Sequence, residues 1–190
     1  KRSILLKSFL ISNNIYVHSL VSFCLVFFVL LIQNNIVYPI EKHITNSPVI
    51  DYVSILYLPH GVKIILFFIY RYISILPIFL ASYLYGYTLD FNIVHLIGSF
   101  IGILAIFVAF FLCSFLLKDE TIYSKKYLLW RLLIVVTFIS SLLNSIFQSM
   151  LISFTFKDFN LNLLFLLGDI MGSITIIFLI ISLRRSFLGL

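Results

Sequence analysis

Charge is scarce in this chain, and negative charge is the scarcest. Of its 190 residues only 11% are charged, with 13 Lys and Arg against 7 Asp and Glu, whereas 62% are hydrophobic. The mean hydropathy is +1.17. A soluble domain of this size cannot hide so much apolar side chain, because a large share of its atoms must face water. The composition therefore excludes a soluble globular domain and predicts an integral membrane protein.

Cysteine and catalytic motifs are also nearly absent. The two cysteines, Cys24 and Cys113, lie inside apolar runs with no metal-ligand spacing around them, which favours plain packing residues. The sequence has no phosphate loop, zinc-spaced His/Cys set or nucleophile elbow. We therefore expect no metal, no cofactor, no catalytic residue and no enzyme activity. The net charge of +6 does not indicate a nucleic-acid partner, because basic residues stand at the ends of apolar runs.

Long apolar runs fill most of the chain. A helix needs about 20 apolar residues to cross a bilayer, whereas a membrane barrel shows short alternating strands. The unbroken runs predict an all-α, polytopic helical bundle with one integral membrane domain over residues 1–190. About six spans are expected, at residues 15–38, 52–70, 73–87, 92–117, 127–154 and 160–183. The stretch 39–51, with Glu41, is expected to be a solvated loop without a functional signal.

The distribution of Lys and Arg predicts the orientation of these spans. With both termini in the cytoplasm, the outer loops hold only Lys42 and Lys157. The inner loops and tails hold Lys1, Arg2, Lys7, Arg71, Lys118, Lys125, Lys126, Arg184 and Arg185. Positive residues are retained on the cytoplasmic side of membrane proteins. We therefore expect a multi-pass protein of the bacterial inner (plasma) membrane, surrounded by the lipid bilayer, with both termini cytoplasmic.

The second expected span contains its own interruption and its own charge. Pro59 and Gly61 are expected to break the helix, and His60 and Lys63 lie at and just past the break. A lysine at the centre of a spanning helix costs about 2.5–3.5 kcal/mol on insertion scales. A second half-helix starting near Gly61 would point its free N–H groups and positive dipole end into the bundle. That end favours an anion, either a carboxylate or a bound ligand.

The expected partner of Lys63 is Asp169, the only acidic residue in another deeply apolar stretch. Lys63 lies eleven residues after Tyr52, and Asp169 nine after Asn160. At about 1.5 Å per residue, both lie roughly 14–16 Å below the outer boundary, close to the midplane. The sequence therefore predicts that these two segments meet.

Two interpretations of this meeting point remain open. In the first, it binds a small ligand or ion through Pro59, His60, Gly61, Lys63, Gly168, Asp169 and Gly172. In the second, a proline kink and a structural Lys63–Asp169 pair only lock two helices together. The spacing of Gly168 and Gly172 favours close helix packing. Asn144 and Gln148 share one face of the fifth span and are expected to form interhelical hydrogen bonds.

Motifs at the two paired segments point to a family. The first is Leu58-Pro59-His60-Gly61 with an apolar run, then Arg71, Pro77 and Ala81-Ser82; the second is Leu167-Gly168-Asp169 followed by Gly172. Together they resemble the MASE1 family of bacterial membrane-associated sensor domains. His60 replaces the serine of the family's motif, and Lys63 is an added charge.

The resemblance implies a short, stand-alone relative that senses a small ligand and signals through a separate partner protein. The alternative is a small-solute transporter, or the substrate-binding membrane subunit of one, since six helices with a midplane polar site also suit that task.

Overall fold

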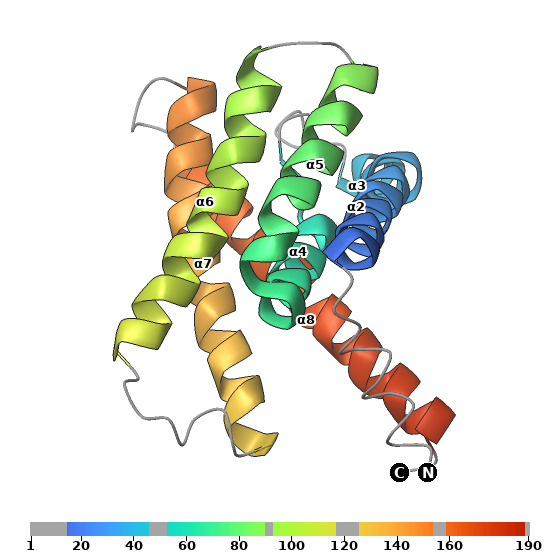
Figure 1. Ribbon diagram of the computed structural model, residues 1–190. Coiled ribbons are helices and arrows are strands. Elements are labelled where there is room, and N and C mark those ends of the chain that lie inside the picture. Colours follow the sequence, from blue (N-terminus) through green and yellow to red (C-terminus); the bar gives the residue numbers. More distant parts are fainter. Residues whose placement is uncertain (1–14, 46–52, 90–92, 117–125, 154–158, 189–190) are drawn as a thin grey trace.

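The computed structural model describes residues 15–45, 53–89, 93–116, 126–153 and 159–188. Within these ranges every regular element is a helix, so the fold is an all-α bundle, as predicted (Figure 1). The helices are α2 (Ile15–Ile32), α3 (Tyr38–Thr45), α4 (Leu58–Tyr70), α5 (Ile75–Leu89), α6 (Ile93–Leu116), α7 (Lys126–Ser153) and α8 (Phe159–Leu188). The basic N-terminal residues and most of the charged loop 118–126 lie outside the described residues.

Five helical stretches are long and apolar enough to cross a membrane, so the chain is a multi-pass membrane protein. They are Ile15–Thr45, Leu58–Thr88, His95–Phe115, Leu132–Leu151 and Leu161–Leu183. This count differs from the six predicted spans, because the expected spans 52–70 and 73–87 fall into one apolar stretch made of α4, a 3-10 turn and α5, although the chain turns back within that stretch. With 13 residues, α4 is only about 20 Å long and is too short to cross alone.

The predicted break at Pro59–Gly61 takes another form in the structure. Residues 53–57 are not helical, and α4 begins at Leu58 with Pro59 in its first turn. Proline suits this position because the first N–H groups of a helix have no partner within the helix. Pro59 and Gly61 therefore start the helix and do not interrupt it.

The chain reverses direction between α4 and α5. The start of α4 lies beside Gln33, whose side-chain oxygen accepts a hydrogen bond from the Leu58 N–H. The end of α4 lies near the beginning of α2, where the rings of Tyr70 and His18 are 4.6 Å apart. Farther along, Tyr85 of α5 contacts Phe27, so the chain has turned back along α2. Figure 1 shows α5 rising toward the end of the bundle where α6 begins.

The reversal is made at Arg71, in the turn Arg71–Ser74. Arg71 has φ 54° and ψ −136°, the only positive φ of a non-glycine residue among those described. Such a conformation is one that glycine adopts easily and that costs other residues about 1–3 kcal/mol. The Arg71 N–H still donates to the Phe67 carbonyl and closes the last turn of α4.

The first span is longer than predicted. The helix continues from α2 through a π-helical turn (Gln33–Val37) into α3, and only residues 46–51 of the expected loop 39–51 lie outside the described part. The Tyr38 N–H donates to the Gln33 carbonyl, five residues back. A π turn of this kind lets the helix absorb the proline at position 39, which cannot donate a hydrogen bond. Glu41 therefore projects from a helix and not from a loop.

Two apolar clusters hold the bundle together. One joins α4, α6 and α7 and includes Ile64, Ile106 and Val136; the other joins α2, α4, α5 and α6 and includes Val26, Leu66 and Ile78. Large apolar side chains such as Phe178, which is 68% exposed, cover the outside. That outer surface suits contact with lipid chains.

Candidate functional site

Helix α7 carries a polar stripe on the side that faces the bundle interior. The buried polar residues of α7 recur every three or four positions: Thr137, Ser140, Ser141, Asn144, Ser145 and Ser149. The opposite side is apolar and exposed, as at Ile134 (62%) and Phe138 (54%). Polar groups in a membrane helix turn away from lipid because hydrocarbon offers them no hydrogen bonds. The sequence analysis selected only Asn144 from this stripe, although the spacing of the serines was visible in the sequence.

Asp169 lies where α4, α7 and α8 meet, and it is 1% exposed. The Asn144 side-chain N–H donates to Asp169 Oδ2 at 2.6 Å, and His60 Nδ1 lies 3.6 Å from the same oxygen. On its other side, His60 Nε2 lies 3.1 Å from the Ser140 hydroxyl oxygen. We call His60, Lys63, Ser140, Asn144 and Asp169 the polar cluster.

The hydrogen bonds of the polar cluster leave room for one proton. Ser140 donates its hydroxyl hydrogen to the Thr137 carbonyl at 3.1 Å, so His60 Nε2 is the donor toward Ser140. A neutral imidazole with its hydrogen on Nε2 then presents a lone pair at Nδ1. That lone pair faces the Asp169 carboxylate, so two hydrogen-bond acceptors lie 3.6 Å apart. The cluster can therefore take up a proton or respond to another small cation.

Lys63 is the remaining member of the polar cluster. It is 5% exposed and lies one helical turn after His60 on the same side of α4. It interacts electrostatically with Asp169, but no ion pair within 4 Å joins the two in the described part of the chain. The structure thus brings both predicted residues into one buried site, with Asn144 and His60 as the direct neighbours of the Asp169 carboxylate.

The glycines predicted with this site allow backbones to touch. A Cβ added to Gly172 would lie 2.1 Å from the Tyr57 carbonyl oxygen, and one on Gly168 would lie 2.1 Å from the Ser54 carbonyl oxygen. A Cβ on Gly61 would lie 2.6 Å from the Cα of Ser173. These distances are too short for any side chain, so the three glycines bring α4 and residues 54–57 directly against α8.

This contact places irregular backbone deep in the bundle. Gly172 lies at the middle of the apolar stretch Leu161–Leu183, and the Tyr57 N–H donates to the Gly168 carbonyl at 3.0 Å. Non-helical backbone at membrane depth is tolerated where protein satisfies its polar groups. Residues 53–57 meet this condition, and they bring the start of α4 to about the middle of the bundle.

Glu41 and Gln33 supply hydrogen-bond partners for the polar groups of residues 54–58 that have none within a helix. The Glu41 carboxylate accepts hydrogen bonds from the Leu56 N–H at 2.7 Å, the Ile55 N–H at 3.2 Å and the Ser54 hydroxyl at 2.7 Å. Gln33 donates to the Ser54 hydroxyl at 2.8 Å and accepts from the Leu58 N–H at 3.1 Å. Glu41 was expected to be a solvated loop residue, and its hydrogen bonds to this segment correct that prediction.

Some buried polar atoms near the cluster have no partner among the described residues. They are Asn144 Oδ1 and the hydroxyl oxygens of Thr137, Ser141 and Ser173. Asn144 Oδ1 is 3.6 Å from the place where a Cβ on Gly102 would stand, and no other described side chain or neighbouring helix comes within 4 Å of that place. Unsatisfied buried acceptors are points where water, an ion or a small ligand can bind. In the described ranges, no group of three or more His, Cys, Asp or Glu side chains could hold a metal ion.

The interhelical hydrogen bonds expected of Asn144 and Gln148 are present. Asn144 joins α7 to α8 through Asp169, and the Gln148 side chain joins α7 to α6 by donating to the Gly98 carbonyl at 2.8 Å.

Neither a family model, a curated protein nor a solved structure matches the chain. The site is therefore interpreted from its own chemistry.

Proposed function

We propose that the chain is a sensor-like membrane protein that binds a small ligand or ion at the polar cluster and signals through a separate partner. The observation that carries the proposal is the buried Asp169 carboxylate at the first turn of α4, held by Asn144 and facing His60. Ionisable groups within the membrane are costly, and they mark ion or ligand pathways more often than simple packing.

The position of the cluster explains how binding would become a signal. His60 belongs to α4, Asn144 to α7 and Asp169 to α8, so one small occupant touches three helices at once. A ligand shifts a conformational equilibrium only as far as it binds one arrangement better than another. A proton or cation at Asp169 changes the attraction between the carboxylate and the Lys63 ammonium, and the contact of the carboxylate with His60, both on α4. The packing of α4 on α8 is the contact that this change would alter.

The relationship to the MASE1 family and the location in a bacterial inner membrane belong to the same proposal. The two stretches that carry the resemblance, around Pro59 and around Asp169, lie against each other, as expected if both serve one site. The reversal between α4 and α5 supports termini on the same side of the membrane. Reporter fusions after residue 190 and within residues 118–126 should both give a cytoplasmic signal, and a periplasmic signal from either would contradict this orientation.

A transporter is the second candidate, favoured by one specific observation. Helix α4 starts near the middle of the bundle after a non-helical segment, as do the half-helices that surround substrate sites in many transporters. Uptake of labelled small solutes into proteoliposomes distinguishes the two functions. Accumulation that depends on Asp169 would favour the transporter, whereas ligand binding without uptake would favour the sensor.

The direct test is a thermal-shift screen of the purified protein in detergent, over pH and over panels of small cations and anions. We expect at least one condition to raise the melting temperature of the wild type. His60→Gln should fold normally and lose that response, because glutamine keeps hydrogen-bonding capacity but cannot carry the proton or charge.

The matched control is His95→Gln, the same change at an exposed histidine of α6. It should keep the full response of the wild type. A His60→Gln protein that melts normally and still responds fully would remove His60 from the binding site. A wild type that responds to no condition in the screen would contradict the sensor proposal itself.

A further inference from the structure

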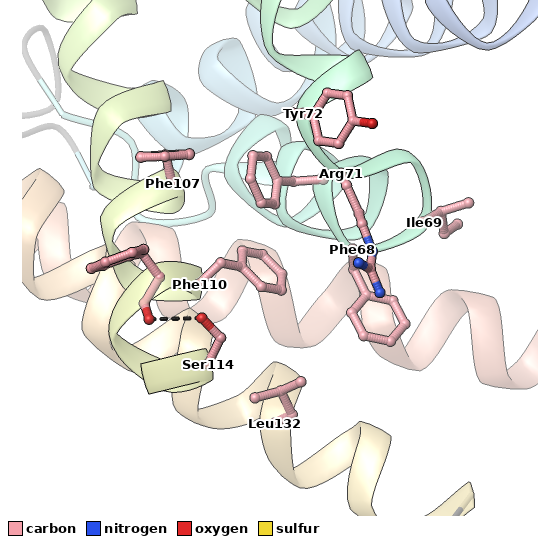
Figure 2. A pocket seen from close by; sticks show the side chains of 10 residues that line it. Phe68, Ile69, Arg71, Tyr72, Phe107, Phe110, Ser114 and Leu132 are labelled. Carbon is pink, nitrogen blue, oxygen red and sulfur yellow. Dashed lines mark hydrogen bonds between the residues drawn. The ribbon is translucent and has the colours of Figure 1, made fainter. Parts of the chain in front are cut away.

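A second feature lies at the other end of α4, away from the polar cluster. Phenylalanine side chains from α4 and α6 line a groove of about 460 Å³, open on one side, with Leu132 of α7 and Arg71 at its edges (Figure 2). The rings include those of Phe67, Phe107 and Phe110; Phe67 and Phe110 lie 4.8 Å apart between centroids. The groove is therefore mostly apolar, with the hydroxyl-bearing Tyr72 and Ser114 in its lining and a cation at Arg71.

The level of the groove in the bilayer follows from the length of α4. The helix starts near the middle of the bundle and runs for 13 residues, about 20 Å. Half of the hydrocarbon layer is about 15 Å thick, so Arg71 reaches the level of the lipid head groups. Tyr70 and Tyr72 flank it, as aromatic residues do at membrane interfaces. Phe67 and Phe68 lie before Arg71 along α4, in the region of the acyl chains, and Phe107 and Phe110 of α6 pack against them.

Arg71 occupies this position although its backbone conformation is unfavourable for an arginine. Its positive φ is a conformation that glycine would adopt without strain, yet the residue at the turn is an arginine. The guanidinium group lines the groove, and planar guanidinium groups bind phosphate oxygens with two parallel hydrogen bonds. An arginine in a strained backbone conformation beside an apolar groove indicates a binding role for its side chain.

We propose that this groove binds an anionic phospholipid of the surrounding bilayer, with its phosphate at Arg71 and an acyl chain along the phenylalanine rings. The occupant is a lipid because the groove is continuous with the lipid-facing surface, where Phe111 is 61% and Ile69 46% exposed. Basic pockets between membrane helices on the positively charged side bind anionic head groups. This site is independent of the polar cluster, since none of its lining residues belongs to that cluster.

Thermal melting in nanodiscs tests the proposal, comparing phosphatidylcholine alone with the same lipid containing phosphatidylglycerol. The wild type should melt several degrees higher with phosphatidylglycerol. Arg71→Gly should remove the backbone strain and melt about 2–4 °C higher than the wild type in phosphatidylcholine, but it should lose the phosphatidylglycerol shift. Lys42→Gln, which removes an exposed cation of α3, should keep that shift.

A second variant, Ser114→Leu, tests the apolar half of the site. Ser114 lines the groove, and among the described residues its hydroxyl bonds only to the Phe111 carbonyl of its own helix, so a larger side chain should fill the acyl position and reduce the shift. A shift that persists in both Arg71→Gly and Ser114→Leu would overturn the proposal. So would a wild type without any shift, or a shift that inorganic phosphate alone reproduces in phosphatidylcholine.

Discussion

The two ends of α4 lie in opposite environments. Its first turn is buried among α7 and α8, where His60 faces Asp169 and the backbone touches glycines of α8. Its last turn opens toward lipid, with phenylalanine rings and the strained Arg71. Polar contacts and close backbone contacts hold the first end of α4 in place, whereas aromatic packing and one charged side chain characterise the second end. The same 13-residue helix thus joins a site that excludes lipid to one that is open to it.

The difference between the two ends of α4 follows from the lipid that surrounds the bundle. Inside a bilayer, apolar side chains gain little by leaving lipid for protein, so apolar surface alone cannot choose which helices pair. Hydrogen bonds, charges and small residues make that choice, and these gather at the first end of α4. At the second end the aromatic residues can face either protein or lipid at similar cost. We therefore expect substitutions of Lys63, Asp169 or the glycines of α8 to act on folding, and those at the second end to act on lipid dependence.

The largest effect should come from separating the charges of the polar cluster. Asp169→Asn and Lys63→Met should each destabilise the protein by about 3–5 kcal/mol, because each leaves a buried charge without its opposite. The double variant should recover a good part of that loss, since it removes both charges. Folded yield in size-exclusion chromatography and melting in detergent measure all three variants. Losses that simply add in the double variant would show that the two residues are not coupled.

The next effect tests the backbone contact on α8. Gly172→Ala should cost about 3 kcal/mol or more, at or above the upper end for overpacking, because the new methyl group meets the Tyr57 carbonyl and not a movable side chain. Gly102→Ala is the matched control in α6, where the nearest described atom of another helix to the new methyl group is Asn144 Oδ1 at 3.6 Å. Thermal melting of the two variants gives the comparison. Equal stability of the two would mean that α4 and α8 can separate without cost.

The sequence was sufficient to predict the class of fold and the meeting of the two charged segments. Hydropathy gives the helices, and the rarity of charge leaves Lys63 and Asp169 few other buried partners. It was not sufficient for the direct neighbours of Asp169, because Asn144 and His60 reach it through the rotation of α7 and α4, which depends on packing. The start of α4 at Leu58 was also missed, because proline is compatible with both a kink and a first turn.

Glu41 was missed for a different reason. Its position between two prolines in a polar stretch is typical of a loop, and its partners at residues 54–56 are more than ten positions away. Only the continuation of α2 through the π turn into α3 directs the carboxylate back over residues 54–56. Long-range hydrogen bonds to backbone leave no local pattern in a sequence. The segment that delivers α4 to the middle of the bundle is therefore the part that sequence reasoning reaches least.

The smallest effect concerns this segment and compares two amides of one π turn. Gln33 is buried and bridges the Ser54 hydroxyl and the Leu58 N–H, whereas Asn35 is exposed and donates only to the Leu31 carbonyl of its own helix. Gln33→Ala should cost about 1–2 kcal/mol, because it leaves the first N–H of α4 and the partly buried Ser54 hydroxyl with fewer partners. Asn35→Ala should stay within about 0.5 kcal/mol of the wild type. Hydrogen exchange of residues 54–61 is the sensitive readout, since Gln33→Ala should speed exchange there while α6 stays protected. Uniformly faster exchange over all helices would instead show that Gln33 supports the whole bundle and not the entry of α4.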